Sequence, residues 1–160
     1  MNNLLNARRV ADSRTEQIQI VMPEQINGYE RLFGGKLVEW IDIVAAVVAR
    51  RHSGRNVTTV SIDNLQFKEA VHVNDTIVLI GEITYVGKTS MEVKVDTFVE
   101  SLSGEKHLVN RAYFVMVALD EKERPVPVPP LKIETEGEKA EWEAGLRRYH
   151  LRKQRTVEQF

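Results

Sequence analysis

The chain has 160 residues, of which 42% are hydrophobic and 28% charged, a balance typical of one globular domain with a modest core. Its 22 Lys and Arg residues nearly offset 23 Asp and Glu residues, so the net charge gives no reason to expect a nucleic-acid or membrane-surface partner. The absence of cysteine excludes disulfides, a catalytic thiol and thiolate metal sites, and it permits a reducing compartment.

The N-terminal ten residues carry Arg8 and Arg9, but no apolar run of signal-peptide length follows them. No stretch of the chain is apolar over a transmembrane length. We therefore expect a soluble, cytoplasmic protein without an obvious export signal.

The first elements are a short strand and a long helix. Alternation of polar and apolar residues from Glu16 to Met22 predicts the strand, which ends at Pro23. Residues Leu37 to Ala49 are apolar on nearly every side, which predicts a helix of about three to four turns enclosed by the rest of the fold. Gly34 and Gly35 immediately precede this helix, Arg50 and Arg51 suit its last turn through the helix dipole, and Ser53 with Gly54 can stop it.

Four further strands are predicted after this helix, in a single main domain. Alternation and the turn residues between the strands give the ranges Val57–Phe67, Thr76–Val86, Ser90–Glu100 and Leu108–Leu119. A phase shift of the alternation near Asp63 and Asn64 indicates a β-bulge in the first of these strands. No internal repeat is found.

The C-terminal part begins with Pro125–Pro130, a proline-rich strap that must be extended. Residues 131–160 then read as a basic helical extension of the main domain, residues 1–130. Thr135 and Glu138 have the spacing of a capping box at its start. One face of this helix is apolar and suited to docking, and it consists of Trp142, Leu146 and Tyr149. The other face is basic and consists of Arg147, Arg148, Arg152, Lys153 and Arg155. The basic face is either a solvated helix end or an anion site.

Asp42 lies in the middle of the most apolar helix, where burying a carboxylate is costly unless another group pairs with it or the chemistry uses it. The carboxylate is either catalytic or ties down a neighbouring loop through backbone N–H groups. Gly34 and Gly35 would let a substrate carbonyl approach the N–H groups at the helix start, the outline of an oxyanion hole, although a tight turn explains them equally well. Asn27, next to Gly28, taken alone favours a turn.

Other catalytic arrangements do not fit the sequence. The four histidines are scattered without metal-ligand spacing, and we expect none on the apolar helix. No nucleophile elbow or phosphate-binding loop occurs. The expected machinery is one carboxylate, backbone donors and water, with no metal.

The spacing N-x-x-x-x-x-F-G-G-x-L-x-E-W-I-D, from Asn27 to Asp42, resembles the motif region of the type II hotdog acyl-CoA thioesterases. Three later segments extend the resemblance over most of residues 12–130: VTTVSIDNLQF, HVNDTIVLIGEITYVGKTSMEV and NRAYFVMVALDE. The resemblance implies an α+β hotdog fold, in which a curved antiparallel sheet wraps around a long central helix. It also implies dimers joined edge to edge and commonly a trimer of dimers, a hexamer.

The resemblance also assigns roles. Asp42 resembles the general base or nucleophile, Asn27 the residue that helps to hold water or the carbonyl, and Gly34 with Gly35 the oxyanion turn. Asn27 of one chain is expected to face Asp42 of another. The bulky residues 29–31 near Asn27 depart from the family's usual small loop and leave the acyl-chain preference open.

Coenzyme A is expected along the turn Lys88-Thr89-Ser90, with Lys88 at a phosphate and Ser90 at a pantetheine amide; a polar hairpin turn is the alternative. Arg147 and Arg148 of the basic face are candidates for its nucleotide end. Coenzyme A is part of the substrate, so no separate cofactor is expected. The rival function is a non-catalytic acyl-CoA sensor on the same fold, which would need no acid on the helix.

Overall fold

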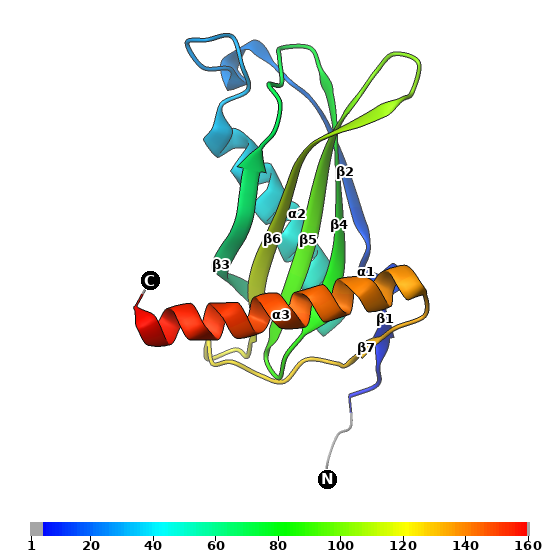
Figure 1. Cartoon of the computed structure of the whole chain (residues 1–160), viewed down its shortest axis with the longest axis vertical. Helices are drawn as coiled ribbons and strands as arrows, with labels where there is room; N and C mark the ends of the chain where they lie inside the picture. Colours follow the sequence, from blue (N-terminus) through cyan, green and yellow to red (C-terminus); the bar gives the residue numbers. More distant parts are fainter. Residues whose placement is uncertain (1–4, 160) are drawn as a thin grey trace.

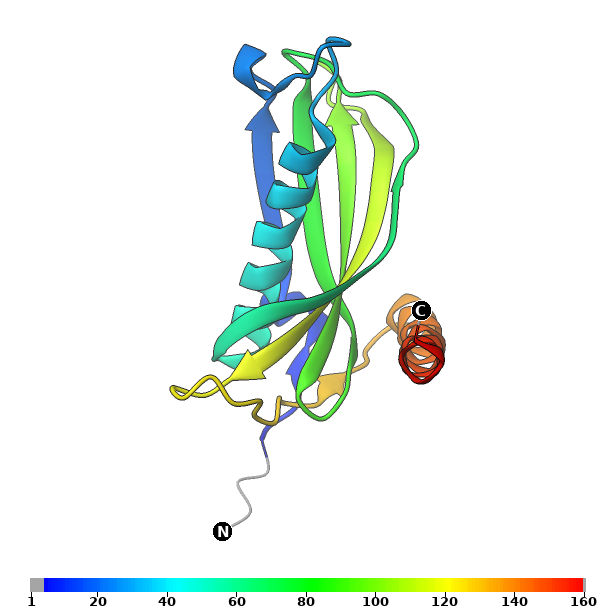
Figure 2. The same ribbon diagram turned by 90° about the vertical axis from the view of Figure 1, so that its left-hand side faces the viewer.

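The computed structural model describes residues 5–159 and contains one five-stranded antiparallel sheet. Its strand order is β2-β4-β5-β6-β3, with β2 at Thr15–Ile20, β3 at Asn56–Phe67, β4 at Thr76–Val86, β5 at Ser90–Glu100 and β6 at Lys106–Leu119. Helix α2 (Gly34–Ser53) runs along one face of the curved sheet, and helix α3 (Glu136–Glu158) crosses the opposite face (Figures 1 and 2). This arrangement confirms the hotdog architecture.

Three short elements lie at the lower end of the molecule in Figure 1: β1 (Arg8–Arg9), α1 (Val10–Ser13) and β7 (Leu131–Lys132). The 3₁₀ helix η1 (Pro23–Gln25) lies in the loop at the upper end. β1 and β7 pair in parallel. Within residues 5–159, no helix is both long enough and apolar enough to cross a membrane.

The predicted strand ranges are confirmed to within two residues. The β-bulge is confirmed as well, because the register of β3 with β6 shifts between Asp63 and Gln66, and Asn64 has a left-handed φ of 56°. Helix α2 is longer than predicted. The two glycines form its first turn, and Gly54 ends it with a φ of 66° that glycine adopts at little cost.

The core lies between α2 and the inner face of the sheet. Met91, Val93 and Val95 of β5 lie on the same face of the strand and are completely buried together with apolar residues of the helix. Gly81 of β4 lets the helix approach closely, since a Cβ at this position would lie 2.7 Å from Val44 Cγ1.

The expectation that the rest of the fold encloses α2 on every side is wrong for a single chain. Ile43 is 46% exposed, Glu39 is exposed and Asp42 is only partly buried. The sheet covers one face of the helix, as Figure 2 shows, and no other segment of the described chain covers the opposite face. Hydrophobic periodicity cannot distinguish a face buried in the core from one that a second chain would cover.

The expectation that α2 carries no histidine is also wrong, because the longer helix includes His52 in its last turn. His52 is completely buried, and its Nε2 lies 2.8 Å from the Pro129 carbonyl oxygen, to which it donates. The Nδ1 atom has no partner among the described residues. The contact joins α2 to the strap Pro125–Pro130, which is extended as predicted.

Stability should fall in mild acid because of His52. Burial, with a smaller contribution from Arg8, lowers the pKa of His52 below its ordinary value of about 6.5, so below that pH the unfolded chain takes up a proton that the folded chain resists. This contribution to stability is present above pH 6.5 and is lost as the pH falls. In His52→Gln, which retains an N–H donor, the free energy of unfolding from urea titrations should decrease less between pH 7.5 and 5.0 than in the wild type. His150→Gln, at an exposed position, is the control; equal decreases in all three proteins would contradict this role.

Candidate functional site

Helix α2 places Asp42 against the edge strand β3. Thr59 Oγ1 donates a hydrogen bond of 2.6 Å to Asp42 Oδ1 and lies 3.3 Å from Met116 Sδ. Asp42 Oδ2 has no hydrogen-bond donor among residues 5–159. One carboxylate oxygen is therefore fixed, and the other remains available to water or substrate.

Thr59 was not identified from the sequence. It lies 17 positions after Asp42 on a different element, and a threonine in a strand of high β-propensity gives no local sign of a functional role. The only available signal was the polar pair Thr58-Thr59 in a strand that follows the acid-bearing helix. Only the tertiary structure shows that this strand lies against the part of the helix that carries Asp42.

The start of α2 presents two backbone donors. Neither Gly34 N–H nor Gly35 N–H has an acceptor within the described chain, whereas Lys36 N–H already donates to the Phe33 carbonyl oxygen at 3.0 Å. A Cβ on Gly35 would lie 2.6 Å from Cε1 of the exposed Phe33 ring, so a larger residue at this position would require that ring to move. The two N–H groups and the helix dipole favour an oxygen that carries developing negative charge.

Asn27 lies near these donors. Its Oδ1 accepts hydrogen bonds from the N–H groups of Tyr29 at 2.9 Å and Arg31 at 3.3 Å, and its amide Nδ2 has no acceptor in the described part of the chain. The side-chain oxygen shapes the loop, as the turn interpretation predicted, while the amide is left to interact with another group. Asn27 and Gly34 line the same cavity, of about 290 Å³.

A single chain divides the predicted catalytic residues into two groups. Asp42 follows Gly34 by eight residues, or roughly 12 Å along a helix at 1.5 Å per residue. Asp42 does not line the cavity that contains Asn27 and Gly34. One carbonyl group therefore cannot contact the glycine donors and Asp42 of the same chain.

The turn Lys88-Thr89-Ser90 joins β4 to β5 at the end of the molecule opposite the start of α2 (Figure 1). Its backbone carbonyls hold other segments: Lys88 O accepts from Val128 N–H at 2.9 Å, and Thr89 O accepts from Ala118 N–H at 3.0 Å. The Lys88 side chain is exposed. The turn thus anchors the strap and leaves the lysine ammonium in solvent.

The apolar face of α3 docks as predicted. Its N-cap is Thr135, whose Oγ1 accepts from Glu138 N–H at 3.1 Å. Trp142 and Tyr149 pack on Tyr85, with ring centroids 4.5 and 5.4 Å apart. Gly145 lets the helix approach the sheet, because a Cβ there would lie 2.7 Å from Tyr85 Cβ.

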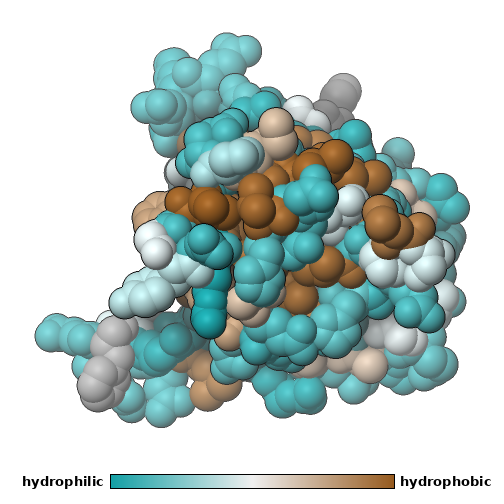
Figure 3. Space-filling model, turned by 90° about the horizontal axis from the view of Figure 1, so that it is seen from above, coloured by the Kyte–Doolittle hydropathy of each residue, from teal (hydrophilic) through white to brown (hydrophobic). Residues whose placement is uncertain are grey.

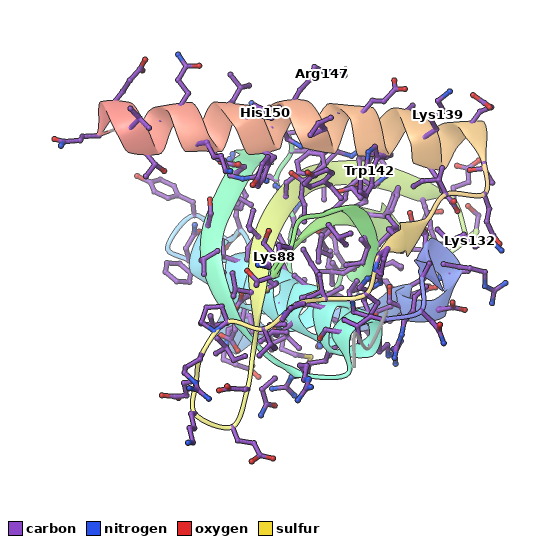
Figure 4. The ribbon with its side chains drawn as sticks, turned by 90° about the horizontal axis from the view of Figure 1, so that it is seen from below. Lys88, Lys132, Lys139, Trp142, Arg147 and His150 are labelled. Atoms are coloured by element: carbon purple, nitrogen blue, oxygen red, sulfur yellow. The ribbon has the colours of Figure 1, made fainter. Side chains whose placement is uncertain are left out.

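Three of the five cations on the basic face of α3 are paired with carboxylates, and two of these three, Arg148 and Arg152, are largely buried. Arg148 donates two hydrogen bonds, of 3.0 and 2.8 Å, to Glu92, whose side chain is 0% exposed, and its guanidinium lies 3.7 Å from the centroid of the Tyr113 ring. Arg152 Nη1 bridges Glu92 and Asp63 at 3.0 Å each, and Arg155 donates to Asp63 at 2.8 Å. A phosphate group would have to displace a buried carboxylate from Arg148. Arg147, by contrast, is exposed and points away from the sheet (Figure 4).

Arg148 and Arg147 provide a matched pair for a stability test. Arg148→Ala leaves the buried Glu92 carboxylate with a single arginine and should reduce the free energy of unfolding by about 3 kcal/mol. Arg147→Ala should change it by less than about 0.5 kcal/mol. Urea titrations measure both values, and similar effects of the two substitutions would show that the Glu92 contact is not stabilising.

Among residues 5–159, no group of three or more His, Cys, Asp or Glu side chains has an arrangement that could hold a metal ion. The residues at the two halves of the site are instead one carboxylate, one hydroxyl, one amide and backbone N–H groups.

Comparison with known proteins identifies similar chains along most of the length. Residues 29–103 match the model of the thioesterase superfamily. An uncharacterized acyl-CoA thioester hydrolase of Bacillus subtilis is 37% identical over 90% of this chain and 84% of its own length. A cytosolic acyl coenzyme A thioester hydrolase of Rattus norvegicus is 33% identical over 88% of this chain, which spans 38% of the rat protein.

Solved structures are similar over nearly the whole chain. An apo-hexameric acyl-CoA thioesterase has a TM-score of 0.90 and 38% identity, covering 95% of this chain and 98% of its own. An acyl-CoA hydrolase of Staphylococcus aureus, in complex with butyryl coenzyme A, coenzyme A and coenzyme A disulfide, has a TM-score of 0.91 and 29% identity, with 96% and 94% coverage. Alanine variants of the Staphylococcus aureus protein replace an asparagine, an aspartate and a threonine. These are separated by 15 and 17 residues, the spacings of Asn27, Asp42 and Thr59 here.

Proposed function

This chain belongs to the thioesterase superfamily, and from that membership we propose that it hydrolyses fatty acyl-coenzyme A to a free fatty acid and coenzyme A. The observation that carries the proposal is the Asp42 carboxylate, held on one oxygen by Thr59 and open on the other, in the middle of a helix whose first N–H groups have no acceptor in the described chain. A binding protein would need no such acid.

In the proposed reaction, Asp42 either takes a proton from a water molecule that attacks the thioester carbonyl carbon, or attacks that carbon directly to form a mixed anhydride that water then hydrolyses. Asn27 holds the water or the carbonyl group through its amide. Gly34 and Gly35 N–H groups stabilise the negative charge that develops on the carbonyl oxygen. Coenzyme A then leaves as a stable thiolate, so the site needs no strong general acid. The N–H groups that bind the carbonyl oxygen are suited to a reaction without a metal.

We propose that two chains build each site. Because roughly 12 Å of helix separates Gly34 from Asp42, a carbonyl at the glycine donors of one chain can meet only an Asp42 supplied by a second chain. A two-fold axis that brings two α2 helices together in antiparallel orientation places each glycine pair opposite the other chain's acid. The site then occurs twice per dimer.

The surface around Asp42 supports this pairing. Ile43 is 46% exposed on α2, and Val60 and Ile62 are 55% and 44% exposed on β3, an edge strand without a partner on its outer side in the described chain. Exposed apolar side chains beside an open strand edge are typical of a surface that another chain covers. We propose a dimer through this surface and a trimer of such dimers, which would give the same number of chains as the hexameric structure that this chain resembles.

For the coenzyme, we propose that Lys88 contacts a phosphate, that Thr89 and Ser90 lie beside the pantetheine arm, and that Arg147, an exposed cation on α3, contacts the nucleotide end. Arg148 is omitted because Glu92 and Tyr113 occupy its guanidinium. A cytoplasmic location fits the compartment of the mammalian relatives, which are cytosolic enzymes.

The direct test is to incubate the purified protein with acyl-CoAs of several chain lengths and to record the release of free thiol. We expect catalytic turnover without added metal. Saturable acyl-CoA binding without thiol release would instead support the acyl-CoA sensor.

A further inference from the structure

The cavity of about 290 Å³ lies between the start of α2 and the ends of β3 and β6. Its inner wall is apolar and buried, whereas its polar lining residues, among them Arg31, Lys68 and Glu69, are exposed at the surface. The buried wall consists of Leu32, Leu37, Val71 and Val109. Figure 3 shows apolar side chains gathered on this end of the molecule.

Phe67 connects this cavity to the backbone donors. It lines the cavity, is 55% exposed, and its Cζ atom would lie 3.4 Å from a Cβ on Gly34. The ring therefore packs directly against the backbone that carries the unpartnered Gly34 N–H group. A carbonyl oxygen bound at this N–H group would place its carbon at the entrance of the cavity.

We propose that this cavity binds the acyl chain of the substrate and that Phe67 and Val109 set the chain length that fits; this inference rests on the proposed function. A thioester carbonyl carbon bears two arms. The pantetheine arm contains amides, which would lose hydrogen bonds against the apolar wall, and it continues into a charged nucleotide. The hydrocarbon arm gains by leaving water.

The apolar wall predicts how activity depends on the acyl chain. Each further methylene group that reaches this wall leaves water, so kcat/KM should increase with chain length until the chain fills the cavity and should then level off or decrease.

Two substitutions should move this optimum in opposite directions. Phe67→Ala removes the outer wall and should shift the preference to longer chains. Val109→Phe fills the inner wall and should lower kcat/KM for decanoyl-CoA relative to butyryl-CoA about tenfold or more. Ile18→Ala, at an exposed apolar position of β2 outside the cavity lining, is the control and should keep the wild-type profile. Thiol release from acetyl- to palmitoyl-CoA provides the profiles, and thermal melts verify folding.

Equal changes for all chain lengths in both variants would overturn the assignment, because a cavity that holds the coenzyme arm or no ligand cannot discriminate acyl chains. Phe67→Ala alone suffices if Val109→Phe does not fold, since Phe67 is largely exposed. A wild type that hydrolyses no acyl-CoA would refute the proposed function, not the cavity. In that case, calorimetry should show that Phe67→Ala shifts the tightest binding to longer acyl-CoAs and that Val109→Phe shifts it to shorter ones. Unchanged chain-length preferences in binding would refute the cavity assignment as well.

Discussion

Asp42→Asn is expected to lower kcat for acyl-CoA hydrolysis by roughly 10²- to 10⁴-fold, the usual contribution of a positioned general base. The amide keeps the size of the side chain and can still accept the Thr59 hydrogen bond, but it can neither take a proton from water nor attack the carbonyl carbon. Thiol release at saturating substrate measures this loss.

The same variant should fold and assemble normally. Because Asp42 is only partly buried and is hydrogen-bonded, removing its charge should change the melting temperature little. Thr59→Val, which leaves the acid but removes the donor that orients it, should have a smaller effect on kcat, about tenfold. Undiminished turnover in Asp42→Asn, with a lower melting temperature, would assign the carboxylate a structural role instead.

Mixing two inactive variants is expected to restore activity, because each site takes its residues from two chains. Asn27→Ala should lower kcat roughly 10²-fold, because it removes one polar contact to the reacting carbonyl group. When Asp42→Asn and Asn27→Ala chains are unfolded, combined in equal amounts and refolded, half of the dimers carry both variants and one of their two sites is intact. The expected activity is about a quarter of that of the wild type at equal protein concentration.

A matched mixture distinguishes a shared site from one within a single chain. Wild-type chains mixed equally with the double variant Asn27→Ala, Asp42→Asn should also retain about a quarter of the activity if chains share the site, because every mixed dimer is then inactive. A site within one chain would give about half of the activity in this mixture and almost none in the first. That second pattern would exclude the shared arrangement, and the thiol assay used for kcat is sufficient to detect it.

The sequence predicted the parts of the fold that depend on local periodicity. Alternation defined the strands, including the bulge at Asp63 and Asn64, because successive side chains of a strand point to opposite faces. The length of the apolar run and the stop at Ser53 and Gly54 defined α2, although the helix begins about a turn earlier than predicted and although His52 was assigned outside it.

Asn27, Gly34, Gly35 and Asp42 were selected from the sequence by their residue types and by the family motif. Local chemistry singled out Asp42, because a carboxylate in an apolar helix is costly without a partner or a function, whereas the family motif was needed to select Asn27 and the two glycines. The pairs that hold the site and α3 in place were decided only by the tertiary structure. Thr59 meets Asp42 across 17 residues, and Arg148 meets Glu92 across 56.

By itself, then, the sequence determined the order of elements and selected the residues that we propose for catalysis, since both depend on side-chain type and on spacing within one element. Only the tertiary structure decided that the arginines of α3 neutralise buried carboxylates, that one face of α2 stays open and that the Gly34 donors lie too far from Asp42 to act together within one chain. The physical reason is that charge pairing, burial and distance depend on which distant segments the sheet brings together, and no local pattern in the sequence specifies those contacts.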